Sequence, residues 1–286
     1  MFDAIFSFLL NGGSPAARVV TATLPLLAVI TLLATGMLAF AVQGLVGRPY
    51  HDAEVERRGS TPFIGMWLRR CFSWLTQPLV AFLVWSGVSP NAITIASAVI
   101  ATGAAVAVAY GQMGLGGWLF ACSALCDFLD GHVARATHRS SAHGALLDSV
   151  LDRYVEAVLF IGLAWFYRGS WLLLCVLAAL SGSLLVSYVR ARGEALGVRF
   201  QNVGIVQRPE RVVLLALALT LSPALDVALD PAGAHPIYRL VAAALAILAV
   251  TTHISAVQRF AYAHRQLSAT TPCSAAGAEA GDGEAH

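Results

Sequence analysis

Long apolar runs alternate with short polar connections along most of this chain. Each run is close to the about 20 residues that an α-helix needs to cross the hydrocarbon core of a bilayer. A segment in lipid must satisfy its own backbone hydrogen bonds, which favours helices at that depth. The pattern therefore predicts an all-α, polytopic membrane helical bundle. The seven predicted spans are residues 19–46, 91–111, 114–130, 142–167, 170–189, 211–229 and 237–258.

The composition agrees with a membrane protein. Hydrophobic residues make up 58% of the chain and charged residues only 12%, whereas about a quarter of a soluble domain is charged. We therefore expect an integral membrane protein in contact with membrane lipid and without a nucleic-acid partner. The five cysteines form no CxxC pair and no metal-ligand spacing, so they predict no disulfide framework.

Arginines gather in alternate connections, at 47–70, 135–141 and 190–211 and after the last span. The connections between them carry almost no charge. Basic loops stay on the cytoplasmic side of a membrane, so all these connections are expected there and the N-terminus outside. The expected location is a bacterial cytoplasmic membrane.

Two regions flank the predicted membrane domain of residues 68–265. Residues 1–67 form an N-terminal extension with one transmembrane helix. Residues 266–286 are small, polar and acidic, which predicts a disordered tail. Within the membrane domain, residues 68–86 contain an Arg pair and Pro78. They are interpreted as an amphipathic segment lying on the membrane surface, with a short transmembrane helix as the alternative.

Four aspartates stand between apolar runs, at Asp127, Asp130, Asp148 and Asp152. A carboxylate at membrane depth costs roughly 2.5–3.5 kcal/mol, so such residues suggest function. Asp127 and Asp130 share one helical face, and Asp148 and Asp152 share another. A short loop joins the two helices, so they are antiparallel neighbours. All four acids are therefore expected to converge near the cytoplasmic surface.

Converging carboxylates repel one another unless cations lie among them. Ligand sets made only of oxygen select hard divalent ions such as Mg²⁺ or Mn²⁺. Four carboxylates suit a site with two such ions, which usually serves phosphoryl chemistry. Gly131, Ala134 and Gly144 lie near these acids and would leave space beside the metals, although small residues also serve close helix packing.

The pattern D127-x2-D130-G131-x2-A134-R135-x8-G144-x3-D148-x3-D152 resembles the signature of the CDP-alcohol phosphotransferase family. The resemblance covers roughly residues 68–265. It implies a six-helix core, to which the first span is an addition with a surface amphipathic helix beside it. It also implies homodimers.

The resemblance further implies a transferase of phospholipid biosynthesis. Such enzymes move a substituted phosphate from a CDP-linked donor, usually CDP-diacylglycerol, to an alcohol and release CMP. Asp127, Asp130, Asp148 and Asp152 would hold two divalent metals, and Asp152 would also deprotonate the acceptor hydroxyl. The implied nucleotide-binding residues are Gly131, Ala134, Arg135 and Gly144. Asn91 and Thr94 are open between nucleotide contact and helix-start capping, and Ser89 with Pro90 is an expected helix start.

The stretches "SYVRARGE" and "QRPER" resemble the branch that makes phosphatidylinositol phosphate and archaetidylinositol phosphate. There the acceptor is inositol 1-phosphate, which implies a phosphate site. The residues implied are Arg190, Arg192, Arg208, Arg211 and, as a further candidate, Arg259. Bacterial enzymes of this branch often have Lys where Arg190 stands, so glycerol 3-phosphate or another alcohol remains an alternative acceptor. The positive-inside rule alone would also account for these arginines.

Two other functions compete with this interpretation. Acids within a membrane also mark ion paths, so a cation-coupled transporter is one alternative. Transporters usually place such sites near the midplane between repeated halves, whereas here the acids lie at one end and no repeat is visible. An inactive scaffold is the other alternative, but the motif is complete. His132, His138 and His143 lie near the acids and are not expected to be ligands, because hard metals prefer oxygen.

Overall fold

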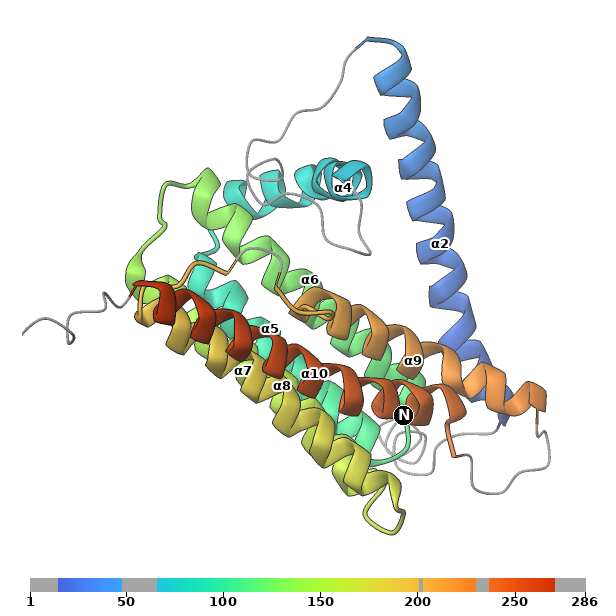
Figure 1. Cartoon of the computed structure of the whole chain (residues 1–286). Helices are drawn as coiled ribbons and strands as arrows, with labels where there is room; N and C mark the ends of the chain where they lie inside the picture. The colour runs from blue at the N-terminus through green and yellow to red at the C-terminus, as the bar shows by residue number, and fades with distance from the viewer. Residues whose placement is uncertain (1–14, 48–65, 201–202, 230–236, 271–286) are drawn as a thin grey trace, which may run out of the picture.

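The computed structural model describes residues 15–47, 66–200, 203–229 and 237–270, which form helices joined by short connections and contain no strand. This confirms the predicted all-α fold (Figure 1). The helices of this described part are α2 (Pro15–Leu45), α4 (Met66–Trp85), α5 (Pro90–Ala109), α6 (Met113–Ala136), α7 (Ala142–Phe166), α8 (Leu172–Ala195), α9 (Arg208–Leu229) and α10 (Arg239–Thr270).

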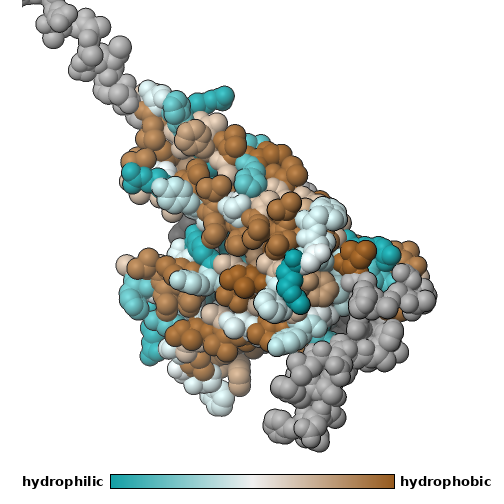
Figure 2. Space-filling view, turned by 90° about the horizontal axis from the view of Figure 1, so that it is seen from below, coloured by the Kyte–Doolittle hydropathy of each residue, from teal (hydrophilic) through white to brown (hydrophobic). Residues whose placement is uncertain are grey.

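Five of these helices are long and apolar enough to cross a membrane, namely α2, α5, α8, α9 and α10. Helices α6 and α7 were also predicted as spans, and they run beside the others in the bundle (Figure 1). They carry Asp127, Asp130, Asp148, Asp152 and Glu156, and acidic residues are rare in segments that face lipid. Apolar side chains cover much of the face in Figure 2. The protein is therefore an integral membrane protein.

The boundaries differ from the predicted ones at several points. Helix α10 continues to Thr270, so residues 266–270 of the expected tail are helical, while 271–286 lie outside the described residues. Helix α8 continues to Ala195, which makes Arg190 and Arg192 helical residues rather than loop residues. Most of the first basic connection, residues 48–65, also lies outside the described part.

The predicted surface segment is helix α4, which crosses the direction of the bundle helices (Figure 1). Aromatic contacts connect it to its neighbours. The ring of Trp67 meets Phe40 of α2 edge-on at 5.6 Å between centroids, and Phe72 meets Phe128 of α6 at 4.9 Å. Helix α4 thus joins the N-terminal helix to the acidic end of α6.

Helices α5 to α10 run alternately up and down, so the end of α6 and the start of α7 lie at the same end of the bundle as the end of α8 and the start of α9 (Figure 1). Side-chain caps define the first residues of two helices, α5 and α7. Ser89 caps α5 and accepts a hydrogen bond from Ala92 N–H, with Pro90 at the first helical position, as predicted. Ser141 caps α7 through the N–H of Gly144.

Glycines let the central helices approach closely. A Cβ on Gly162 of α7 would collide with the backbone of Ala105 in α5, and one on Gly116 of α6 with the side chain of Val108 in α5. Small residues at helix contacts are typical of membrane bundles, where backbones pack tightly in the absence of water. These contacts hold α6 and α7 against α5 and so fix the acidic residues relative to each other.

Helices α7 and α9 are linked by a buried ion pair. The guanidinium of Arg211 donates to both carboxylate oxygens of Glu156, at 2.7 Å from Nε and 2.9 Å from Nη2. The side chains are only 1% and 7% exposed. Helix α7 otherwise packs mainly on α5 and α8, and α9 on α6, α10 and α2. This bidentate pair therefore sets the position of α9 along α7.

Gly162→Ala should destabilise the bundle, because the added methyl group has no room against the Ala105 backbone. Overpacking of this kind costs about 1–3 kcal/mol, which should lower the thermal midpoint of the detergent-solubilised protein by several degrees. Gly103→Ala is the matched control, since its Cβ would meet Leu119 at an ordinary 3.8 Å. An equal midpoint for both variants would contradict the packing argument.

Glu156→Met should be strongly destabilising because it leaves the Arg211 charge buried without a partner, a loss of about 3–5 kcal/mol. The double variant Glu156→Met with Arg211→Met should recover most of that stability, since apolar pairs often replace buried ion pairs without loss. Thermal unfolding followed by circular dichroism would measure both. A double variant no more stable than Glu156→Met would show that the pair is not the interaction that matters.

Candidate active site

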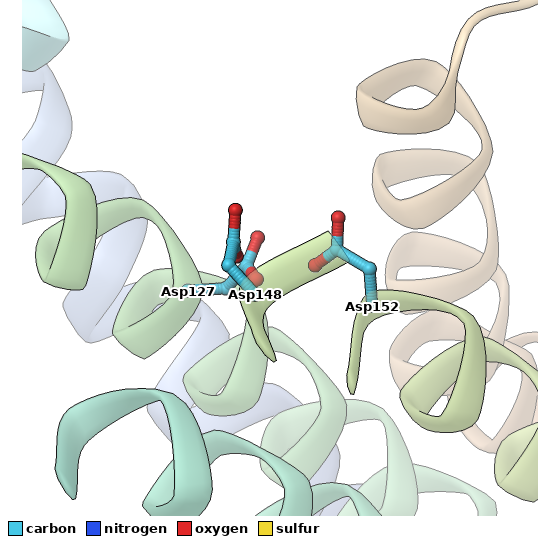
Figure 3. A group of neighbouring side chains, drawn as sticks. All are labelled: Asp127, Asp148 and Asp152. Carbon is cyan, nitrogen blue, oxygen red and sulfur yellow. The ribbon is translucent and has the colours of Figure 1, made fainter. Parts of the chain in front are cut away.

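Three carboxylates meet within about three helical turns of the α6–α7 loop. Asp127 comes from α6, and Asp148 and Asp152 come from successive turns of α7 (Figure 3). One oxygen of each lies within 4.8 Å of an oxygen of the others. The structure thus brings together three of the four predicted acids, because the helical spacing and the short α6–α7 loop place them at the same depth.

Asp130, the fourth predicted acid, lies outside this group of three. It is buried, and its Oδ2 accepts a hydrogen bond of 2.6 Å from the hydroxyl of Thr94 in α5. Asp127 and Asp148 still lie close enough to repel its charge. Ser89 rather than Thr94 caps α5. The Thr94 hydroxyl instead donates to Asp130 and holds its carboxylate in place.

Arg208, the first residue of α9, lies among the carboxylates. Its Nη1 is 3.0 Å from Oδ2 of Asp127, and its Nη2 is 2.6 Å from Oδ1 of Asp152. The sequence resemblance assigned this arginine to the acceptor phosphate, whereas in this structure it pairs with two of the predicted metal ligands. It therefore supplies the positive charge that the clustered acids need here.

The predicted nucleotide-binding residues lie one turn from the acids. A Cβ on Gly131 would come within 3.3 Å of Nη1 of Arg135. A Cβ on Gly144 would come within 3.2 Å of the Ser141 hydroxyl and 3.4 Å of Oδ1 of Asn91. Larger residues at these two glycines would press on polar groups beside the acids. Ala134 is half-buried on α6 between Gly131 and the end of the helix.

The remaining predicted arginines differ in their surroundings. Arg259 of α10 is buried and donates to the carbonyls of Val203 and Val186 at 2.9 and 3.1 Å. Arg190 is exposed and pairs with Glu194 at 2.8 Å. Both Arg190 and Arg211 lie near enough to Arg259 to repel its charge.

Arg259 donates to the carbonyl of Val186, one turn before Arg190 on α8, and Arg190, Arg211 and Arg259 together are called here the arginine region. Arg192 lies exposed in the last turn of α8. Two nitrogens of Arg211 are bound by Glu156, while Nη1 is buried without a hydrogen-bond partner in the described part of the chain. Arg211 can therefore offer an anion its charge and one nitrogen, but not the bidentate fork that was predicted.

Glu156 is the residue that sequence reasoning missed. It is buried and holds Arg211. The available signal was its spacing: Glu156 follows Asp152 by four residues on the same face of α7, as Arg211 follows Arg208 by three on α9. These two intervals could have predicted that the two acids of α7 pair with the two arginines of α9.

The donor set fits a divalent cation. Its ligand atoms are carboxylate oxygens only, they lie close together, and Asp152 Oδ1 is buried without a hydrogen-bond partner in the described residues. Oxygen ligands of this kind bind Mg²⁺ and Mn²⁺. Asp127, Asp148 and Asp152 are the residues that would hold such ions, with Asp130 adjacent.

Known proteins share this fold. A crystal structure of the phosphatidylinositol phosphate synthase of Mycobacterium tuberculosis in complex with manganese and citrate superimposes with a TM-score of 0.58 at 27% identity. The match covers 66% of this chain and 88% of that one. A second structure of the same protein, with CDP-DAG bound, gives a TM-score of 0.56 and covers 92% of that chain.

Sequence relatives agree with the structural ones. A phosphatidylinositol phosphate synthase of Streptomyces avermitilis is 33% identical over 77% of this chain and 92% of its own length. An archaetidylinositol phosphate synthase of Methanothermobacter thermautotrophicus is 38% identical over 61% and 83% of the two chains. The sequence profile described as CDP-alcohol phosphatidyltransferase matches residues 87–257, from just before α5 into α10. The chain therefore belongs to the CDP-alcohol phosphatidyltransferase family.

Proposed function

We propose that this protein transfers a phosphatidyl group from CDP-diacylglycerol to inositol 1-phosphate, releasing CMP. The observation that carries the proposal is a group of three carboxylates with a separate arginine region at the same end of the bundle. The acids would bind the metals that neutralise the donor diphosphate, and the arginines would bind a second phosphate, that of the acceptor. The relatives named above are inositol phosphate synthases, which supports the same acceptor.

Asp127, Asp148 and Asp152, with Asp130 beside them, are the residues proposed to hold two Mg²⁺ or Mn²⁺ ions. When bound, such ions would neutralise the donor diphosphate and stabilise CMP as it leaves. Thr94 contributes indirectly, because its hydroxyl fixes the orientation of the Asp130 carboxylate. The protein itself positions the acids on two rigid helices rather than on a loop.

The transfer is an in-line displacement at phosphorus. The acceptor hydroxyl oxygen forms a bond to the phosphorus that carries diacylglycerol, and the bond from this phosphorus to the oxygen bridging it to CMP breaks. CMP leaves with that electron pair, and the hydroxyl proton goes to the carboxylate of Asp152. Asp152 suits this role because it is the less exposed of the two acids paired with Arg208, at 12% against 22% for Asp127.

The nucleotide is proposed to lie beside Gly131 and Gly144. Neither glycine carries a side chain that would fill the space next to Arg135 and Asn91. Ala134 continues the same face of α6, and Arg135 offers a guanidinium to the cytidine or its phosphate.

The acceptor phosphate is proposed to bind in the arginine region, with Arg190 and Arg259 as the main contacts and Arg192 at the exposed rim. An anion there would relieve the mutual repulsion of these like charges. Arg211 is buried below this site and contributes mainly its positive charge to phosphate binding. Glycerol 3-phosphate is the alternative acceptor, since it also brings a phosphate.

The expected orientation fits this chemistry. Basic residues and clustered acids share one end of the bundle, which we place on the cytoplasmic side of a bacterial membrane, where CDP-linked donors and phosphorylated alcohols would meet. We also propose residues 68–265 as the catalytic membrane domain, the N-terminal helix as an added anchor in contact with lipid, and a homodimer as the assembled form.

Cation-coupled transport, the alternative from another class, loses its support. The acids lie on the half of α6 and α7 nearer the α6–α7 loop, and the chain belongs to an enzyme family. Release of CMP is the property that separates the two functions.

Asp152→Asn should abolish CMP release, by roughly 10²-fold or more, because the variant loses the proposed base and a metal ligand. The assay mixes detergent-solubilised protein with CDP-diacylglycerol, inositol 1-phosphate and Mg²⁺ or Mn²⁺ and measures CMP. A thermal midpoint close to that of the wild type would show that folding is intact. Wild-type-like CMP release by this variant would remove Asp152 from the mechanism.

An acceptor screen should give CMP with inositol 1-phosphate, less with glycerol 3-phosphate and almost none with free inositol. Arg190→Gln should raise KM for the phosphorylated acceptor about tenfold or more, the loss expected for a hydrogen bond to a charged group, while KM for CDP-diacylglycerol stays unchanged. Arg168→Gln is the charge-matched control, since Arg168 lies exposed at the opposite end. Equal rates with free inositol would contradict the phosphate site.

A further inference from the structure

Arg208 lies where the carboxylate group meets the proposed site for the acceptor phosphate. Its guanidinium forms ion pairs with two acids, Asp127 and Asp152. The same guanidinium cannot hold these carboxylates and also turn away to a phosphate. Its position therefore makes it either a fixed neutraliser of the acids or a group that changes partners.

Helices α7 and α9 form two rungs of ion pairs. The inner rung is Glu156 with Arg211, and the outer rung is Asp152 with Arg208. The inner rung is bidentate and almost fully buried. It fixes the register of α9 against α7, so Arg208 is always presented to the acids. Its residues cannot exchange partners without leaving charges buried.

The outer rung has the opposite character. The Arg208 side chain is 30% exposed, against 1% for Arg211. Nε of Arg208 and Oδ1 of Asp152 both lack a hydrogen-bond partner in the described residues, although Nη2 of Arg208 lies 2.6 Å from that oxygen. The contact is thus an ion pair without a well-directed hydrogen bond. Buried polar atoms that remain unsatisfied favour any rearrangement that satisfies them.

A divalent cation at these carboxylates would repel a guanidinium that stayed in contact with them. Arg208 lies three residues before Arg211, beside the arginine region that is already crowded with positive charge. Displacement of Arg208 is therefore favourable only when an oxyanion lies nearby to receive it. A phosphate bound in the arginine region is such a group, and a guanidinium fork suits it.

We propose that Arg208 is an exchangeable internal counter-cation, paired with Asp127 and Asp152 in the metal-free enzyme and transferred to the acceptor phosphate when these carboxylates bind metal. The inference rests on the proposed function and deepens it. Metal and acceptor phosphate then bind cooperatively through one side chain. Asp152 becomes free to take the hydroxyl proton only when the acceptor is in place.

The test measures Mn²⁺ binding without turnover. Free Mn²⁺ is quantified by electron paramagnetic resonance in solutions of the full-length, detergent-solubilised protein, with and without inositol 1-phosphate and in the absence of CDP-diacylglycerol. Binding of Mn²⁺ by inositol 1-phosphate alone is measured without protein and subtracted. In the wild type, the acceptor should lower the Mn²⁺ dissociation constant by about fivefold or more, and by linkage Mn²⁺ should tighten acceptor binding equally.

Arg208→Gln should bind Mn²⁺ more tightly than the wild type before any acceptor is added, and the acceptor should no longer change that affinity. Arg208→Lys keeps the charge but lacks the fork that bridges two acids, so its Mn²⁺ affinity should lie between the two. Arg139→Gln removes the same charge from an exposed position in the α6–α7 loop. It should retain both the wild-type affinity and the wild-type effect of the acceptor.

Two results would overturn the exchange. One is weaker or unchanged Mn²⁺ binding by Arg208→Gln, provided that circular dichroism shows this variant to be folded. If it is not folded, weaker or unchanged Mn²⁺ binding by Arg208→Lys would have the same meaning. The other is an undiminished effect of the acceptor in Arg208→Gln. Either result alongside normal CMP release by the wild type refutes only the exchange. Coupled binding with no CMP from any acceptor would instead support the exchange and refute the proposed transfer reaction.

Discussion

Acidic side chains within an apolar bundle require positive charge beside them, and this constraint organises the whole catalytic end of the protein. An uncompensated carboxylate in such surroundings costs several kcal/mol. Here Asp127 and Asp152 share Arg208, while Glu156 is held by Arg211. Both arginines belong to the first turn of α9. That turn is thus the electrostatic complement of α7, and its placement decides where the acids can bind anything else.

Much of the fold could be predicted because the bilayer imposes length and apolarity on each helix. The spacing of Asp127, Asp148 and Asp152 likewise predicted their convergence, since two helices joined by a short loop have few ways to pack. The ends of helices were less predictable. Helix α8 extends through Arg190 and Arg192, and α10 extends past residue 265, because polar residues continue a helix once it leaves the apolar layer. Hydropathy reports only where that layer ends.

The partners of individual side chains could not be obtained from the same patterns. The resemblance assigned five arginines to one phosphate site, yet Arg211 binds Glu156, Arg208 binds two aspartates and Arg259 binds backbone carbonyls. Asp130 carries the right spacing for the acidic group but turns to Thr94 in α5. Such choices depend on helix rotation and on contacts between segments far apart in sequence. A motif fixes residue types and intervals, but not which charge neutralises which.

The two rungs between α7 and α9 show how one pair of helices can combine rigidity with exchange. Position along a helix separates the roles: a four-residue step on α7 and a three-residue step on α9 bring one pair toward the bundle interior and the other toward its polar end. In the interior, low dielectric and the bidentate hydrogen bond make the Glu156–Arg211 pair costly to break. At the polar end, Arg208 keeps access to water and has an unsatisfied Nε. A chemically identical guanidinium is therefore structural at one position and able to move at the other.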